Sequence, residues 1–174
     1  MTDAIVTDRL ILRRPEARDL DAWTAFFMSP RARFVGGGAT TGPGRAWRAF
    51  ASIIGHWDLR GWGIRVIEDR ARGTPLGGVG PFYPADWPEP EMSWTLWSAE
   101  AEGRGVAQEA AARMLTHARD DLGWTTAVSY IDPENGRSAA LARRLGARID
   151  HDALGPDGDP VEVWRHPLTR KATA

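Results

Sequence analysis

The chain has 174 residues, contains no cysteine and carries a formal net charge of −1 at pH 7. This length is enough for one domain with a sizeable core, and an apolar content of 43% with a charged content of 26% is ordinary for a globular protein. The lack of cysteine excludes disulfides, thiolate metal sites and a cysteine nucleophile. The near-neutral charge argues against a basic face for nucleic acid or for an anionic membrane.

The sequence shows no sign of a membrane segment or an export signal. No apolar run approaches the ~20 residues that cross a bilayer. Residues 1–14 are charged and lack the apolar region of a signal peptide. We therefore expect one cytoplasmic domain, residues 1–174, that binds neither nucleic acid nor membrane; a homodimer is compatible with the sequence.

The first half of the chain predicts a strand, two helices and a meander of three strands. Residues 7–14 form a β-prone stretch, and residues 19–28 and 45–59 place apolar side chains at helical intervals. The segment between the helices, residues 31–44, is rich in glycine and predicts a loop. This loop is either a lid over a cleft or a flexible surface segment. The three strands are expected at residues 61–68, 75–83 and 91–97.

The second half alternates between helices and strands. Helices are expected from Val106 to about Leu122 and, after Pro133-Glu134-Asn135, up to Leu145. The complete order is β-α-α-β-β-β-α-β-α-β-β, which predicts an α/β (α+β) fold with a central, mixed, mostly antiparallel sheet of about seven strands and about four helices. The remaining strands are expected at residues 125–132, 147–151 and 161–166, with an acidic turn at 155–160 and a frayed tail at 171–174.

A turn with two glycines, Gly103-Arg104-Gly105, joins the strand at 91–97 to the helix that begins at Val106. The first N–H groups of a helix lack internal partners, and the helix dipole adds about half a positive charge there. Glycine also lets phosphates approach the backbone. The turn is therefore an anion site or a tight connection whose glycines serve geometry alone. A P-loop or a Rossmann motif fits less well, because no Gly-Lys-Ser/Thr follows and no parallel βαβ repeat opens here.

Three stretches in this order resemble the GNAT superfamily of N-acetyltransferases, and within it the RimJ/RimL-like branch of ribosomal-protein N-terminal acetyltransferases. The resemblance covers essentially the whole chain. It implies the GNAT fold and an acyltransferase that moves an acetyl group from acetyl-CoA to a primary amine, without a metal. The stretches are Thr7-Asp8-Arg9-Leu10-Ile11-Leu12-Arg13 with Asp19-Leu20, then Gly103-Arg104-Gly105-Val106-Ala107 with Glu109-Ala110, then Asp132-Pro133-Glu134-Asn135 with Ser138 and Leu145-Gly146-Ala147.

The resemblance also implies which residues bind the coenzyme. The backbone of Leu96 and Trp97 would pair with the pantetheine arm like an added strand. Asn135 would hydrogen-bond the same arm or cap the helix that follows it. The N–H groups that would cradle the pyrophosphate belong to Arg104, Gly105, Val106, Ala107 and Gln108.

Charged side chains near the turn raise two further questions. Arg104, Arg137 and Arg143 are either ligands of the coenzyme's phosphates or solvated helix side chains. The superfamily usually has Gln or Arg where this chain has Glu102. A carboxylate is unfavourable beside a pyrophosphate, so we expect Glu102 to turn outward or to cap the helix.

The general acid is the first of two catalytic groups that the resemblance implies. Many members use a tyrosine on the last long helix, but the corresponding position here is Ala142. In the RimJ/RimL-like branch a serine near the helix start takes this role, and it maps onto Ser138, which could also be a first-turn serine bonded to the backbone. The missing tyrosine motivates an alternative function, an acyl-CoA sensor or structural module without turnover.

The general base implied by the resemblance is Glu91, at the start of the strand that leads to the turn; it is otherwise a solvated carboxylate at the strand edge. His56 and His117 are alternatives, although we expect both on helix surfaces. Trp62, Trp94 and Trp97 are candidates for the wall of the acceptor cleft. Trp94 and Trp97 point to opposite faces of their strand, so one of the two is expected in the core. The acceptor, a protein N-terminus or a small-molecule amine, is left open.

Overall fold

The computed structural model describes residues 4–156 and 160–168. Eight strands form one sheet in the order β1-β2-β3-β4-β5-β6-β8-β7. Every pair of neighbours is antiparallel except β5 and β6, which are parallel. The strands are β1 (Ile5–Val6), β2 (Leu10–Arg13), β3 (Arg65–Asp69), β4 (Pro75–Phe82), β5 (Glu91–Leu96), β6 (Thr126–Ile131), β7 (Arg148–Ile149) and β8 (Glu162–Pro167).

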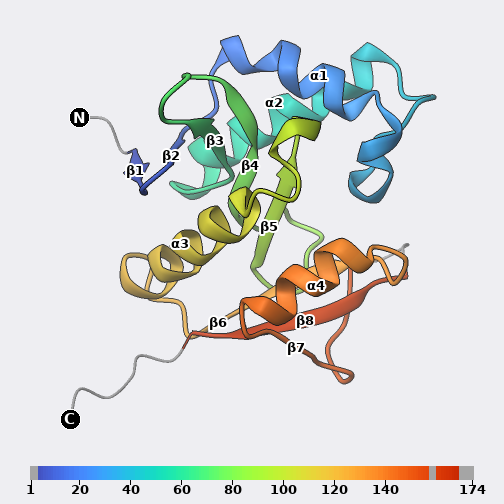
Figure 1. Cartoon of the computed structure of the whole chain (residues 1–174). Coiled ribbons are helices and arrows are strands. Elements are labelled where there is room, and N and C mark those ends of the chain that lie inside the picture. The colour runs from blue at the N-terminus through green and yellow to red at the C-terminus, as the bar shows by residue number, and fades with distance from the viewer. Residues whose placement is uncertain (1–3, 157–159, 169–174) are drawn as a thin grey trace.

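Four α-helices flank the sheet, as the sequence predicts (Figure 1). None of the helices within the described residues is long and apolar enough to cross a membrane. The α-helices are α1 (Leu20–Phe27), α2 (Pro43–Arg60), α3 (Val106–Asp120) and α4 (Gly136–Arg144), and the 3-10 helices are η1 (Ala17–Asp19), η2 (Pro30–Val35) and η3 (Ala99–Ala101).

The predicted mixed, mostly antiparallel α/β fold is confirmed, with two differences in detail. An eighth strand, β1, pairs with β2, and its two residues are too few to show an alternating pattern. The segment 31–44 is not a continuous loop. Ser29 caps η2 by accepting a hydrogen bond from the N–H of Arg31, Gly36 ends η2 with a φ of 78°, and α2 already begins at Pro43. Part of the predicted turn at 155–160 and the whole tail at 171–174 lie outside the described residues.

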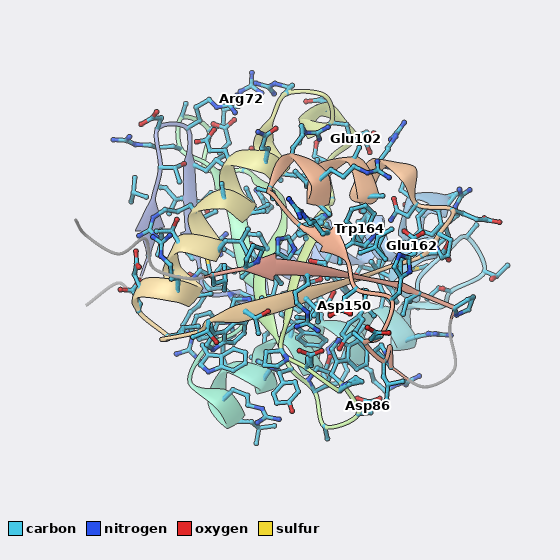
Figure 2. All side chains as sticks on the ribbon, turned by 90° about the horizontal axis from the view of Figure 1, so that it is seen from below. Arg72, Asp86, Glu102, Asp150, Glu162 and Trp164 are labelled. Carbon is cyan, nitrogen blue, oxygen red and sulfur yellow. The ribbon has the colours of Figure 1, made fainter. Side chains whose placement is uncertain are left out.

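Three clusters of buried side chains hold the helices against the sheet. The first joins α3 to β2, β3, β4 and β5, and the second joins α1 and α2 to the other face of the sheet around Val66. The third lies between α4 and the strands β6 and β8, where Trp164 lies beneath the helix (Figure 2). Helices α3 and α4 are thereby fixed on one side of the sheet, and α1 and α2 on the other.

The parallel pair β5 and β6 opens along its length (Figure 1). Glu91 is paired with Val128, and the N–H of Val128 donates to Pro90 at 3.2 Å. One step further, the Ser129 hydroxyl of β6 donates a hydrogen bond to the Met92 carbonyl of β5 at 2.6 Å. Beyond that point β5 continues to Leu96 without a ladder to β6. The divergence leaves room between the strands at the ends that face α3 and α4.

Candidate active site

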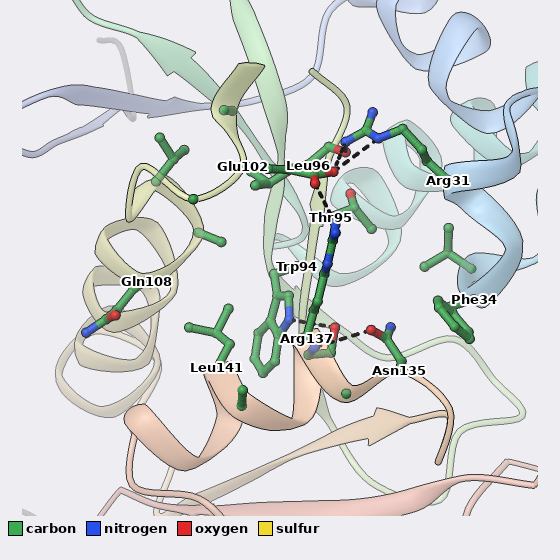
Figure 3. A pocket seen from close by; sticks show the side chains of 18 of the residues that line it. Arg31, Phe34, Trp94, Thr95, Leu96, Glu102, Gln108, Asn135, Arg137 and Leu141 are labelled. Atoms are coloured by element: carbon green, nitrogen blue, oxygen red, sulfur yellow. Dashed lines mark hydrogen bonds and ion pairs between the residues drawn. The ribbon is translucent and has the colours of Figure 1, made fainter. Parts of the chain in front are cut away.

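A cavity of about 1240 Å³ lies where β5 and β6 diverge (Figure 3). Its walls come from η2 and the end of α1, from β5, from the turn before α3 and from the first turns of α3 and α4. Trp94 and Thr95 both line it although successive strand residues point to opposite faces. The cavity therefore connects the α3/α4 side of the sheet to the side that carries α1 and η2.

The glycine turn forms the cavity wall at the start of α3. Gly103 and Gly105 have φ values of 72° and 73°, in the left-handed region that glycine tolerates. The first internal bond of α3 runs from the Glu109 N–H to the Gly105 carbonyl at 3.0 Å, so the N–H groups of the three residues between them precede the helix bonds. Those residues, which also line the cavity, are Val106, Ala107 and Gln108.

Arg9 fixes this turn from outside the cavity. Its guanidinium donates to the Arg104 carbonyl at 2.9 Å and pairs with Glu109 in the first turn of α3 at 2.7 Å. A Cβ on Gly105 would come 3.5 Å from that guanidinium. Free N–H donors, a helix N-terminus and close backbone access together fit a pyrophosphate, so the residues present suit coenzyme A. The side chain of Arg104 is not part of the cavity wall.

Glu102 was expected from sequence to turn outward or to cap α3, and it does neither. Its carboxylate lines the cavity and binds the guanidinium of Arg31 at 2.6 Å and that of Arg137 at 2.5 Å. The hydrogen bond from Arg31 holds the pKa of Glu102 below its usual value, and the charge of Arg137 adds to this effect. Two cations therefore stabilise the carboxylate, which is why it stays in the cavity.

The start of α4 brings two predicted residues together. The Asn135 side chain accepts a hydrogen bond from the Ser138 N–H at 3.2 Å and so caps the helix. The indole N–H of Trp94 donates to the Ser138 hydroxyl oxygen at 3.3 Å. Since the oxygen accepts this bond, the hydroxyl hydrogen is available to a group inside the cavity.

Ala142, the position that corresponds to the superfamily's tyrosine, does not face the cavity. Ala142 is fully buried in the cluster beneath α4, and it is Leu141 that faces the cavity one turn after Ser138. Neither side chain ionises. Ser138 is thus the hydroxyl that α4 presents to the cavity.

Glu91 lies at the other end of β5 and faces away from α3 and α4. Its carboxylate accepts a hydrogen bond from the indole of Trp87 at 2.7 Å. The side chain is buried, and burial raises the pKa of Glu91 to about 7. Because Glu91 and Trp94 are three positions apart in the strand, an odd number, their side chains point to opposite faces, and Glu91 is not part of the cavity wall.

Leu96 and Trp97 occupy different environments at the end of β5. Leu96 lines the cavity, whereas Trp97 is 7% exposed and packs edge-on against Trp23 in the core beneath α1 and α2. Trp94 faces the cavity and Trp97 is in the core, which agrees with the expected division between the two. The carbonyl groups of Leu96 and Trp97 both accept hydrogen bonds from Arg31, at 2.9 and 2.6 Å.

Of the two histidines, His56 is not on a helix surface as expected. His56 is buried, with Nδ1 2.9 Å from the Trp62 carbonyl and Nε2 2.9 Å from the Tyr83 N–H. Burial lowers the pKa of His56, so it is a neutral core residue. His117 is half-buried near the C-terminal end of α3, and its Nδ1 lies 2.6 Å from the exposed carboxylate of Asp121, far along the helix from the cavity. Neither residue lines the cavity.

Several residues of the site could not be identified from the sequence. Arg31, Phe26 and Phe34 reach the cavity from α1 and η2, a region read from sequence as a short helix and a glycine loop. Trp87 covers Glu91 from a loop that was read only as a turn. The contacts join residues far apart in the chain, so no local sequence pattern predicts them.

Arg143, a phosphate candidate, instead lies over the ring of Trp164. Among the described residues, no cluster of three or more His, Asp or Glu side chains is arranged to hold a metal ion.

Comparison with known proteins places this geometry in a family. The model of a family described as the acetyltransferase (GNAT) domain matches residues 9–148. An acetyltransferase from Agrobacterium tumefaciens is 33% identical, with a TM-score of 0.87 over 95% of both chains. Two less similar structures share the fold. A ribosomal-protein-S5-alanine acetyltransferase from Vibrio fischeri is 15% identical, with a TM-score of 0.69 over 95% of this chain and 96% of that chain. RimL, a ribosomal L7/L12 acetyltransferase solved with coenzyme A, is 16% identical, with a TM-score of 0.70 over 94% of this chain and 96% of that chain.

Proposed function

This chain belongs to the GNAT acetyltransferase family, and from this premise we propose that it transfers the acetyl group of acetyl-CoA to a primary amine, by direct attack within a ternary complex. The observation that carries the proposal is the cavity at the divergence of β5 and β6, where the glycine turn and the start of α4 meet. Its volume, its free N–H donors and its opening to both sides of the sheet suit a long coenzyme whose reactive end reaches a second substrate.

Backbone groups make most of the proposed contacts to the coenzyme. The N–H groups of the turn and the start of α3, from Arg104 to Gln108, hold the pyrophosphate, and Arg9 keeps the turn in place. The end of β5 around Leu96 guides the pantetheine arm. Acetyl-CoA supplies an activated acetyl group as a thioester.

Glu91 is proposed as the group that removes the proton from the acceptor's ammonium. A carboxylic acid with a pKa of about 7 is divided between its two forms at neutral pH, so it can accept a proton and then release it. The acceptor would approach on the α1/α2 face of β5, where Trp87 covers the carboxylate. The indole N–H of Trp87 stabilises the charged form and orients it.

Ser138 is proposed as the hydrogen-bond donor to the departing thiolate. Its oxygen accepts from Trp94, and Ser138 lines the cavity, so the hydroxyl hydrogen is free to turn toward a group inside it. A serine hydroxyl is a weak acid, so we expect it to stabilise developing negative charge rather than to transfer a proton completely.

The proposal covers two acceptor classes, protein N-termini and small-molecule amines, and one experiment separates them. Purified protein is first titrated with acetyl-CoA while thermal unfolding is followed, and we expect stabilisation that grows with coenzyme concentration. Thiol release is then measured with a panel of peptides with free N-termini and of polyamines and aminoglycosides. We expect acetylation within one class. The proposed activity is wrong if millimolar acetyl-CoA leaves the melting temperature unchanged, or if the coenzyme binds and no amine is acetylated.

A further inference from the structure

Three charged side chains from three separate elements meet at the mouth of the cavity. Glu102 follows η3, Arg31 lies in η2 and Arg137 lies in the first turn of α4. Each guanidinium binds one oxygen of the carboxylate, Oε1 for Arg31 and Oε2 for Arg137. Figure 3 shows Arg137 extended from α4 across the cavity to reach Glu102. The three side chains, here called the Arg–Glu–Arg bridge, therefore span the space that the coenzyme is proposed to enter.

The two arginines are held to different degrees. Arg31 also donates to the carbonyl groups of Leu96 and Trp97, and its guanidinium lies 5.7 Å from the centre of the Phe26 ring. The side chain of Arg137 is 87% exposed, and its hydrogen bond goes to Glu102. Exposed ion pairs contribute little net stability because water solvates the separated charges well. The contact between Arg137 and Glu102 can consequently be exchanged for another at low cost.

The charges of the bridge leave it ready for an anion. Two guanidinium groups and one carboxylate sum to +1, and removal of the carboxylate from the contact exposes a charge of +2. Guanidinium groups bind carboxylate and phosphate through the same planar donor geometry. The carboxylate stands three residues before Gly105, where the free N–H donors of α3 begin. A pyrophosphate on those donors would lie beside Glu102 and repel it.

We propose that Glu102 is an internal stand-in for the pyrophosphate. In the unliganded protein it holds Arg31 and Arg137 at the mouth of the cavity, and on binding the pyrophosphate takes over both guanidinium groups while the carboxylate turns away. This inference rests on the proposed function. It assigns Arg31 and Arg137 as coenzyme ligands and explains why an acidic residue is tolerated next to the anion site: the carboxylate keeps the cations in position and competes for them.

The test compares Glu102→Gln with Glu100→Gln by calorimetric titration of coenzyme A and of pantetheine, which lacks the phosphates. Glu100 is an exposed carboxylate two residues away and outside the cavity wall, so it controls for the loss of one negative charge. We expect Glu102→Gln to bind coenzyme A about tenfold more tightly at low salt, with a smaller gain at high salt. Pantetheine affinity should not change in either variant, and Glu100→Gln should behave as the wild type.

A double-mutant cycle with Arg137→Ala tests whether Arg137 changes its partner from Glu102 to the pyrophosphate, or whether Glu102 acts only through its negative charge. If Arg137 must leave Glu102 before it binds phosphate, Arg137→Ala should lower the affinity for coenzyme A by a larger factor in Glu102→Gln than in the wild type. We expect about a threefold loss of coenzyme A affinity in the wild-type background and about a tenfold loss in Glu102→Gln. The inference is overturned if Glu102→Gln binds coenzyme A as the wild type does or more weakly, or if the two losses are equal. If the wild type itself binds no coenzyme A, the proposed function has failed first.

Discussion

The two ends of β5 carry carboxylates that the protein treats in opposite ways. Glu91 lies where β5 is still paired with β6, buried beneath Trp87, and burial raises its pKa to about 7. Glu102 lies beyond the open end, bound by two arginines that hold its pKa below the usual value. Burial opposes the charged form at the first site, and ion pairing favours it at the second.

This difference follows from the shape of the strand pair. At the closed end, side chains exclude water and the indole of Trp87 is a neutral donor that offsets only part of the cost of burying a charge. At the open end, water and guanidinium groups both reach the carboxylate. One sheet thus provides a group that can exchange a proton near neutral pH and another that stays ionised and holds cations.

The largest effect should come from filling the anion site at the open end. Gly105→Glu places a side chain and a negative charge on the cradle, in a left-handed conformation that strains the backbone. We expect the thermal shift with acetyl-CoA to vanish. Gly123→Glu is the matched control, because Gly123 has a φ of 72° and lies after the other end of α3. It should lose similar stability and keep its coenzyme affinity; equal loss of binding in both would argue against the cradle.

At the closed end, Glu91→Gln should reduce acetyl transfer by about 10² to 10⁴-fold, the range for removal of a general base. Coenzyme affinity should not change. In the wild type, the transfer rate should rise with pH through about 7 as Glu91 loses its proton. Glu89→Gln is the control, because Arg165 holds the pKa of Glu89 low and the profile should keep its midpoint. An unchanged rate in Glu91→Gln would remove this residue from the mechanism.

The same substitution should change how stability depends on pH. The folded-state pKa of Glu91, about 7, lies above the ordinary value of 4.5, so the folded protein binds the proton more tightly and loses stability as pH rises through 7. Glutamine does not titrate. In urea unfolding, the free energy of unfolding of Glu91→Gln minus that of the wild type should increase by about 2 to 3 kcal/mol when the pH is raised from 5 to 8.

The contrast with Glu102 sharpens this measurement. Its pKa is lowered, so the stability it contributes is present above its unfolded pKa and is lost as pH falls. Glu102→Gln should therefore show a difference from the wild type of the opposite sign, and a small one, because the ion pairs are partly exposed. Two variants with the same sign would contradict the comparison between the two ends.

The smallest effect is expected at Ser138. Ser138→Ala removes one hydrogen bond to developing negative charge and should lower kcat about tenfold, with little change in KM for acetyl-CoA. Ser129→Ala removes a hydroxyl that bonds Met92 and His166 outside the cavity and should affect stability instead of kcat. Single-turnover acetyl transfer would measure both. A kcat of Ser138→Ala equal to that of the wild type would show that another group, or water, stabilises the departing thiolate.

Local sequence patterns were enough to predict most of the elements. Helical spacing of apolar residues located α1 and α3, and the glycines at 103 and 105 marked the start of α3 because only glycine adopts that backbone conformation freely. Asn135 was a candidate cap for α4, and it is one. These features depend on neighbours in the chain, so sequence carries them directly.

Contacts between distant residues could not be predicted in this way. Glu102 was expected to turn outward or to cap the helix, but it stays in the cavity because two arginines, 71 and 35 residues away in the chain, bind its carboxylate. His56 was expected on a surface, but the strands and loops around it bury it. The environment of Glu91 depends likewise on where the loop that carries Trp87 folds back.

The sequence alone therefore predicted most of the order of the elements, the family resemblance and the glycine turn before α3, because each arises from a short run of residues. The tertiary structure decided the state of the two carboxylates. A pKa depends on burial and on nearby charge, and both depend on which segments are brought together in space. The divergence of β5 from β6 separates a buried Glu91 from a paired Glu102.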